Sequence, residues 1–134
     1  MNGNAAQAAG AEGGGVPLQA RIEAAMDQFR EGERWESAIL FSSEGLPLAV
    51  HGSSPVYRED DLLQFAQALI PAMGLFGETR PIREAALFGA GGRVLSFHYF
   101  SAWGEDMALA LVTPRKTGYR RAAAGLIQFI RDLS

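Results

Sequence analysis

The chain has 134 residues, of which 48% are hydrophobic and 20% charged, with a formal net charge of −3 and no cysteine. This length is enough for one domain with a single core, and the composition is that of a globular protein. The charge balance excludes the electrostatic footprint of a nucleic-acid-binding or polybasic lipid-binding protein, and the lack of cysteine excludes disulfides, thiolate metal sites and a cysteine nucleophile.

Residues 1–15 are rich in glycine and alanine and contain no aromatic residue. We expect a disordered tail here, because such a segment buries too little surface to offset its ordering entropy. The start of the chain lacks the features of a secretory signal, and no apolar run reaches the roughly 18 residues of a spanning helix. We therefore expect a domain over residues 16–134 in a cytoplasmic protein that does not insert into a membrane. Eleven of the twelve basic residues are arginine, which suggests a GC-rich bacterial genome.

Helical spacing of apolar residues predicts a first helix over about Val16–Glu31, ended by Gly32. Two apolar runs around a polar break, "AILFSSEGLPLAV", then predict a hairpin that turns at Ser43–Gly45. The first strand is apolar on both faces, so it should be covered on both sides. The return strand, Leu46–His51, contains Pro47, which lacks a backbone donor and favours a sheet edge.

A second helix is predicted over about Glu59–Phe76, with three acidic residues in its first turn, where they suit the helix dipole. Pro71 should kink or break it. Its main apolar stripe consists of Leu62, Phe65, Leu69, Met73 and Phe76, and Leu63 and Ile70 widen it.

Three further strands are predicted over about Ile82–Phe88, Arg93–Phe100 and Met107–Val112, followed by a helix over about Arg115–Leu133. The strand at Met107–Val112 is apolar on both faces and carries small alanines, which indicates the centre of the sheet. The predicted order of elements is α-β-β-α-β-β-β-α.

Features that could carry chemistry have simpler interpretations in this sequence. The glycines of "LFGAGGRV" lie between two strands, whereas a phosphate-binding loop needs them between a strand and a helix. His51 and His98 are isolated on different strands, too few for a metal site, and no serine lies in a nucleophile elbow. The acidic residues 59–61 are typical of a solvated helix start. We expect no catalytic residue, no metal and no cofactor.

The basic cluster "RKTGYRR" at the start of the last helix has two interpretations. It forms a solvated helix end, or it contacts an acidic partner.

With this order of elements, the chain resembles the roadblock / dynein light-chain family, which includes the bacterial MglB-type polarity regulators. The resemblance is carried by "SAILFSSEGLPLAV", by the apolar last strand "DMALALVTP" and by the closing Gly-x-x-Arg helix "TGYRRAAAGLIQFI". It spans roughly Leu18 to Leu133. Pro71 and the aromatic stretch "SFHYFSAW" depart from the family pattern.

The resemblance implies an α/β fold of the α+β type, with a five-stranded antiparallel sheet in the order 2-1-5-4-3. The first and last helices would cover one face of the sheet and the second helix the other. It also implies a non-catalytic protein that forms a homodimer or heterodimer and engages a Ras-like small GTPase, whose nucleotide cycle or localisation it modulates without inserting an arginine finger.

The dimer is predicted to form through the Ile82–Phe88 strand and the second helix, because nothing inside "IREAALF" blocks edge pairing and the helix carries surplus apolar surface. The predicted interface residues are Ile82, Glu84, Ala86, Phe88, Phe65, Leu69 and Met73. The GTPase is predicted to contact Asp61, Gln64 and Gln67, which flank the apolar stripe of the second helix.

An alternative is a small-molecule-sensing module of PAS or GAF type, which shares a sheet-plus-helices architecture. Such a sensor needs a cavity with convergent polar groups, and Tyr99, His98 and Trp103 could line one. A small hydrolase is a distant third interpretation.

Overall fold

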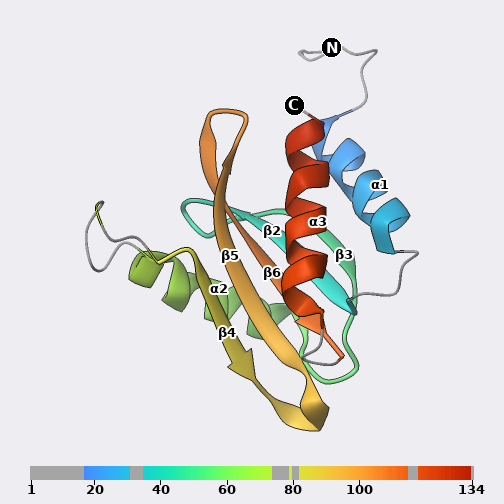
Figure 1. Ribbon diagram of the computed structural model, residues 1–134, viewed down its shortest axis with the longest axis vertical. Helices are drawn as coiled ribbons and strands as arrows, with labels where there is room; N and C mark the ends of the chain where they lie inside the picture. The colour runs from blue at the N-terminus through green and yellow to red at the C-terminus, as the bar shows by residue number, and fades with distance from the viewer. Residues whose placement is uncertain (1–16, 31–34, 74–78, 80–81, 115–117, 134) are drawn as a thin grey trace.

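The computed structural model describes residues 17–30, 35–73, 79, 82–114 and 118–133. These residues form three helices, five strands and a short 3₁₀ turn (Figure 1). In chain order the elements are α1 (Leu18–Arg30), β2 (Ser37–Ser42), β3 (Pro47–Gly52), α2 (Glu59–Met73), β4 (Glu84–Phe88), η2 (Ala90–Gly92), β5 (Val94–Ala102), β6 (Glu105–Thr113) and α3 (Tyr119–Asp132).

All five strands form one antiparallel sheet in the order β3-β2-β6-β5-β4. This is the predicted 2-1-5-4-3 order, so the expected fold class is confirmed. The central strand β6 is buried from Met107 to Thr113. Its alanines, Ala108 and Ala110, lie on the α2 face, where small side chains let a helix approach closely. Pro47 begins the edge strand β3, where its missing N–H breaks no inner ladder.

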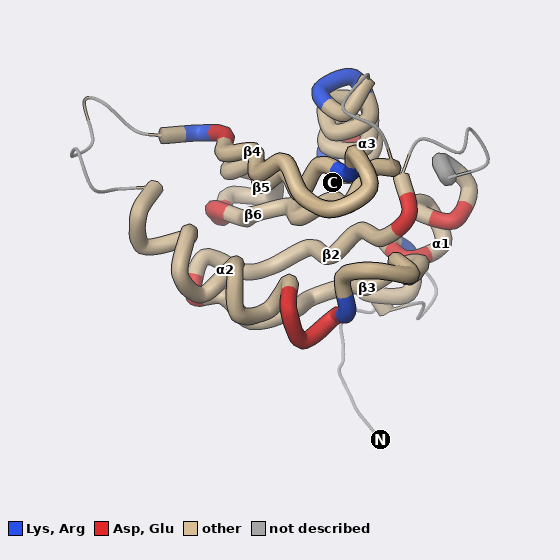
Figure 2. The backbone as a smooth tube through the Cα atoms, turned by 90° about the horizontal axis from the view of Figure 1, so that it is seen from below, with Lys and Arg blue, Asp and Glu red and all other residues tan. Residues whose placement is uncertain are grey.

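The sheet separates two hydrophobic clusters, and Figures 1 and 2 show the helices that cover its two faces. On one face, α1 and α3 pack on alternate residues of the central strands, including Leu109 and Leu111 of β6. On the other face, α2 packs on the intervening residues, including Ala108 and Ala110. In Figure 1, α3 lies in front of the sheet and α2 behind it. This agrees with the helix placement implied by the resemblance.

The second helix differs from its prediction in two respects. It runs through Pro71 to Met73, so the expected break at Pro71 is wrong. Its buried face consists of Leu62, Ala66, Ile70 and Met73, so Leu62, Ile70 and Met73 are buried as predicted. Phe65 and Leu69, predicted on the same stripe, lie on the flank of the helix and are only partly covered. Phe76, predicted as the end of that stripe, lies outside the described residues.

The predicted tail and several element ends also fall outside the described residues: residues 1–16 and 31–34, the end of the predicted second helix and the start of the predicted last helix. Within the described part of the chain, no helix is long and apolar enough to cross a membrane.

Candidate interaction surfaces

The outer edge of the sheet at β4 carries backbone groups with no partner strand among the described residues. The N–H of Tyr99 donates to the Arg83 carbonyl and the N–H of Gly89 donates to the Arg93 carbonyl. Hydrogen-bonded pairs alternate along an antiparallel ladder, so the odd-numbered residues of β4 bond to β5. The backbone groups of Glu84, Ala86 and Phe88 therefore point away from the sheet, ready to pair with another strand.

The side chains at this edge leave apolar surface in water. Phe88 is 67% exposed on the face of the sheet that carries α3, and Leu87 is 38% exposed on the α2 face. Exposed aromatic and aliphatic side chains beside unpaired backbone are the usual composition of a protein–protein contact. Glu84, Ala86 and Phe88, all predicted at the dimer interface, thus lie along one open edge.

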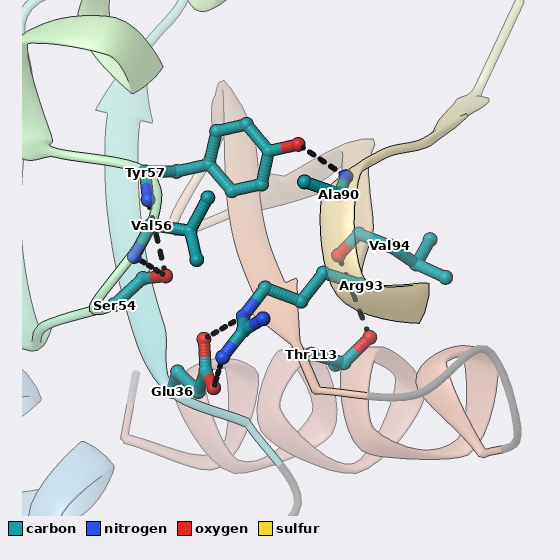
Figure 3. Close-up of polar contacts among 8 residues, drawn as sticks. All are labelled: Glu36, Ser54, Val56, Tyr57, Ala90, Arg93, Val94 and Thr113. Carbon is teal, nitrogen blue, oxygen red and sulfur yellow. Dashed lines mark hydrogen bonds and ion pairs between the residues drawn. The ribbon is translucent and has the colours of Figure 1, made fainter.

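Polar contacts fix the end of β4 that carries Phe88 (Figure 3). The Ala90 N–H donates to the Tyr57 hydroxyl over 2.8 Å, and the Arg93 guanidinium donates to both Glu36 carboxylate oxygens over 3.0 and 3.1 Å. A Cβ on Gly89 would collide with the Tyr57 hydroxyl, so a larger residue here would have to displace the Tyr57 side chain. The β4–β5 turn is therefore held to the loop before α2 and to the start of β2.

The other end of β4 is joined to α3 by an ion pair. The Arg120 Nε donates to the Glu84 carboxylate over 2.9 Å. Opposite Glu84 on β5 lies His98, which is 7% exposed and whose Nε2 has no hydrogen-bond partner within the described residues. Burial lowers the pKa of His98, while the nearby Glu84 carboxylate acts to raise it and Arg120 to lower it. His98 is therefore a buried neutral imidazole.

The opposite edge of the sheet, at β3, is covered by α1. The Glu23 carboxylate accepts the outward-pointing N–H of Val50 over 3.2 Å, and Asp27 pairs with the His51 ring over 2.9 Å. The Glu23 carboxylate thus accepts a backbone N–H of β3 that would otherwise be available to a neighbouring strand.

The remaining predicted interface residues divide into exposed and buried positions. Phe65 is 38% exposed and its ring lies 6.5 Å from that of Phe97 on β5, so it faces the β4 side of the molecule. Leu69 and Ile82 are partly buried against the same cluster. Met73 is only 3% exposed, so it belongs to the core of its own chain and offers no surface to a second one.

The three predicted GTPase-contacting residues lie on the outer side of α2. Gln64 and Gln67 are exposed. Asp61 is partly buried, and its carboxylate accepts the Arg58 N–H over 3.0 Å, which satisfies a backbone donor at the start of the helix. Asp61 therefore has a structural role that the sequence interpretation did not include.

Gln67 also lines a hollow of about 590 Å³ on the α2 side of the sheet. The β2–β3 turn, Ile70 and Pro71 of α2, and Tyr99 of β5 form the rest of its wall. Gly45, at φ +88°, makes this turn close to Gln67 and Ile70. Burial, and secondarily the Asp106 carboxylate, raise the pKa of Tyr99, so its hydroxyl stays protonated and can donate a hydrogen bond.

The residues considered for chemistry are not assembled into a site. The Ser54 hydroxyl accepts the N–H groups of Val56 and Tyr57, as in a simple turn. Ser96 and His98 share one face of β5, but both are buried and no hydrogen bond joins them. Among the described residues, no group of three or more His, Cys, Asp or Glu side chains could hold a metal ion.

The cavity considered for a small-molecule sensor is not formed by the residues proposed for it. Tyr99 packs on the α2 side of the sheet, whereas Trp103 packs with the cluster beneath α1 and α3. His98 neighbours Tyr99 in the strand and therefore points to the opposite face. The three side chains do not converge, so this prediction is wrong for these residues.

The basic cluster at the start of the last helix is described only from residue 118 onwards. Within that part, Arg121 is exposed and Arg120 is engaged with Glu84. Arg120 thus has an acidic partner within its own chain.

No protein-family model matches the sequence, and no curated protein matches it either. Several solved structures match this structure in fold. MglB of Myxococcus xanthus matches with a TM-score of 0.66 at 13% identity, over 85% of this chain and 87% of that one. An MglB with a tetrameric arrangement matches with a TM-score of 0.59 at 19% identity, over 89% and 94%. A Roadblock/LC7 domain from Streptomyces avermitilis matches with a TM-score of 0.58 at 18% identity, over 83% and 92%. The chain therefore has the roadblock/LC7 fold, in the form found in MglB.

Proposed function

We propose that this protein is a cytoplasmic, non-catalytic homodimer that binds a Ras-like small GTPase and modulates its nucleotide cycle or its localisation. The fold shared with MglB and with a Roadblock/LC7 domain supports this proposal, as does the resemblance in sequence. The observation that carries it is the flank of the molecule where the open edge of β4 adjoins half-exposed apolar residues of α2.

The dimer is argued from this flank. Phe65 of α2 and Leu87 of β4 are each 38% exposed on the same face of the sheet. A second copy related by a two-fold axis would extend the sheet through β4 and lay its own α2 beside the first. Pairing would cover both side chains and satisfy the outward backbone groups, at a gain of roughly 25 cal/mol per Å² of apolar area.

Sedimentation equilibrium tests the dimer. We expect the wild-type protein to be dimeric at micromolar concentration and Ala86→Pro to be monomeric, since proline removes an outward N–H that makes no bond to β5. Ala86→Val is the matched control, because it keeps this donor and should stay dimeric. A wild-type protein that sediments as a monomer contradicts the dimer, and a dimeric Ala86→Pro variant contradicts the β4 edge.

In this proposal the GTPase binds the α2 face of the dimer. This face presents the exposed amides of Gln64 and Gln67 and the hollow beside Gln67. The first turn of α2 carries two exposed carboxylates, Glu59 and Asp60. Hydrogen-bonding groups around a partly apolar centre are the composition of a regulated, non-obligate contact.

Binding of Ras-like GTPases from the same genome, loaded with GDP or with a GTP analogue, tests this surface. Gln64→Arg should weaken binding at least tenfold, while Gln28→Arg, the same change on the exposed side of α1, should leave it unchanged. Asp61 is unsuitable for this test because its substitution also removes the cap at Arg58. Normal binding by Gln64→Arg, with binding lost in Arg121→Glu, would move the GTPase to the basic end of α3.

Turnover assays address the non-catalytic part of the proposal. The purified protein alone should hydrolyse neither esters, phosphates nor GTP, and any effect on GTP hydrolysis should require the GTPase. Turnover that follows the protein through purification and disappears in His98→Leu or Ser54→Ala would contradict it.

A further inference from the structure

Three residues of β4 have outward backbone groups with no partner among the described residues. These are Glu84, Ala86 and Phe88, whose N–H and C=O groups point away from β5. The next outward positions at either end are already used. The Ile82 N–H donates to the Met73 carbonyl over 2.9 Å, and the Ala90 N–H donates to the Tyr57 hydroxyl over 2.8 Å.

This restriction selects one register for self-pairing. In a two-fold antiparallel pair, an axis at Ala86 matches each of the three residues with an outward residue of the second copy: Glu84 with Phe88, Ala86 with itself, and Phe88 with Glu84. An axis at Ala85 or at Leu87 leaves one of the three opposite Ile82 or Ala90, whose N–H is already taken. Only the axis at Ala86 lets every free N–H and C=O pair.

We propose that two copies of this chain pair through β4 with Ala86 on the two-fold axis, so that Phe88 of each copy packs against the Glu84–Arg120 ion pair of the other. The proposal rests on the dimer proposed above and adds its register and a contact on the α3 face.

Side-chain directions support the contact. Glu84, Ala86 and Phe88 point to the α3 face, since Glu84 bonds to Arg120 of α3 and alternate residues of a strand share a face. In the selected register the Phe88 ring of one copy stands directly opposite Glu84 of the other, next to the Arg120 guanidinium. An arginine side chain covers an aromatic ring well, through its apolar stem and by cation–π attraction.

The local structure prepares both parts of the contact. Phe88 is the most exposed large hydrophobic residue described, at 67%, and the Tyr57 and Arg93 contacts hold its end of the strand in place. The Arg120 side chain is already aligned by Glu84.

Single cysteines test the register, because the chain has none of its own. Paired residues on the axis have Cα atoms about 5.5 Å apart, within the roughly 4.4–6.8 Å that a disulfide spans. In the selected register the two copies of residue 85, or of residue 87, lie about 8 Å apart, from the strand spacing and rise. Ala86→Cys should therefore cross-link under mild oxidation, whereas Ala85→Cys and Leu87→Cys should not.

Dimer dissociation measured by sedimentation tests the contact. Phe88→Ala should raise the dissociation constant at least about tenfold, while Leu46→Ala, which truncates an exposed hydrophobic residue at the opposite edge, should change it less than about twofold. Arg120→Ala should also raise the dissociation constant when Phe88 is present. In the Phe88→Ala background the same substitution should have a much smaller effect, because the effects of two residues in contact are not additive. Arg121→Ala is the control for loss of one positive charge.

The outcomes separate this inference from the proposed function. A dimer that cross-links through Ala85→Cys or Leu87→Cys instead of Ala86→Cys overturns the register, and additive effects of Phe88→Ala and Arg120→Ala overturn the contact. Neither result affects the GTPase surface on the α2 face. A monomeric wild-type protein would overturn the dimer and the register together.

Discussion

Acid should destabilise this protein through one buried side chain. His98 lies on β5 beneath α3 and is almost fully removed from solvent, and its Nε2 has no hydrogen-bond partner within the described residues. Burial lowers its pKa in the folded state, partly offset by Glu84 and reinforced by Arg120. In the unfolded chain the same imidazole has its ordinary pKa near 6.5.

The sign and size of the effect follow from proton binding. Below about pH 6.5 the unfolded state takes up a proton that the folded state excludes, so stability is fully present above that pH and is lost as the pH falls toward the lowered folded pKa. Each pH unit over which only the unfolded state is protonated costs about 1.4 kcal/mol. Between pH 7.5 and pH 5.0 the loss from His98 has an upper limit of about 2 kcal/mol, which applies if the folded state takes up no proton at this site.

Urea unfolding of the wild type and of His98→Leu, at one protein concentration, measures this loss. The other titrating groups are common to both proteins, so the difference between their unfolding free energies isolates His98. Between pH 7.5 and pH 5.0 the variant should gain stability relative to the wild type, by up to about 2 kcal/mol. A difference that stays constant with pH, or that favours the wild type in acid, would refute the burial of a neutral imidazole.

Three further predictions concern stability. Amide exchange should be slowest in Met107–Val112 and faster in Leu46–His51, because central strands open only with near-global unfolding; the reverse order would contradict the strand order. Leu109→Ala should lower the unfolding free energy by about 2–5 kcal/mol, because the side chain is fully buried, and a loss below about 1 kcal/mol in urea unfolding would show a loosely packed core. Gly89→Ala should cost about 1–3 kcal/mol by thermal unfolding, since its Cβ collides with the Tyr57 hydroxyl and disturbs the bond to Ala90, and an unchanged melting temperature would exclude this close approach.

Local signals in the sequence predict the positions of two strands, whereas the full strand order was implied by the resemblance to the roadblock family. Pro47 marks an edge, since it lacks the N–H that an inner strand needs. The continuous apolar run from Met107 to Val112 marks the centre, since only a strand covered on both faces tolerates it. These signals depend on the residue itself, so they can be interpreted without knowing what packs against it.

The face of α2 could not be predicted in the same way. Apolar residues cover so much of this helix that two overlapping stripes both fit a period of 3.6. The sheet selects the stripe with Ala66 and Ile70, which leaves Phe65 and Leu69 at the flank. That choice depends on the shape of the sheet surface, which helical periodicity does not encode.

The ion pair between Glu84 and Arg120 could not be predicted from the sequence either. The two residues are 36 positions apart, and they meet because the register of β4 on β5 places Glu84 on the side of α3. Arg120 belongs to a basic run whose sequence fits both a solvated helix end and a contact with an acidic partner, and neither interpretation points to Glu84 of the same chain. A long-range contact of this kind needs the packing of α3 as well as the strand register.

The contact between α1 and β3 has a consequence for how far this protein can assemble. A sheet that is open at both edges can add copies at each one and grow into a fibre without limit. Here Glu23 occupies the Val50 N–H at the β3 edge, so a strand that paired there would have to displace it, whereas the outward backbone groups of β4 have no partner among the described residues. Two-fold pairing of β4 consumes that edge in both copies, so growth through the sheet stops at two chains.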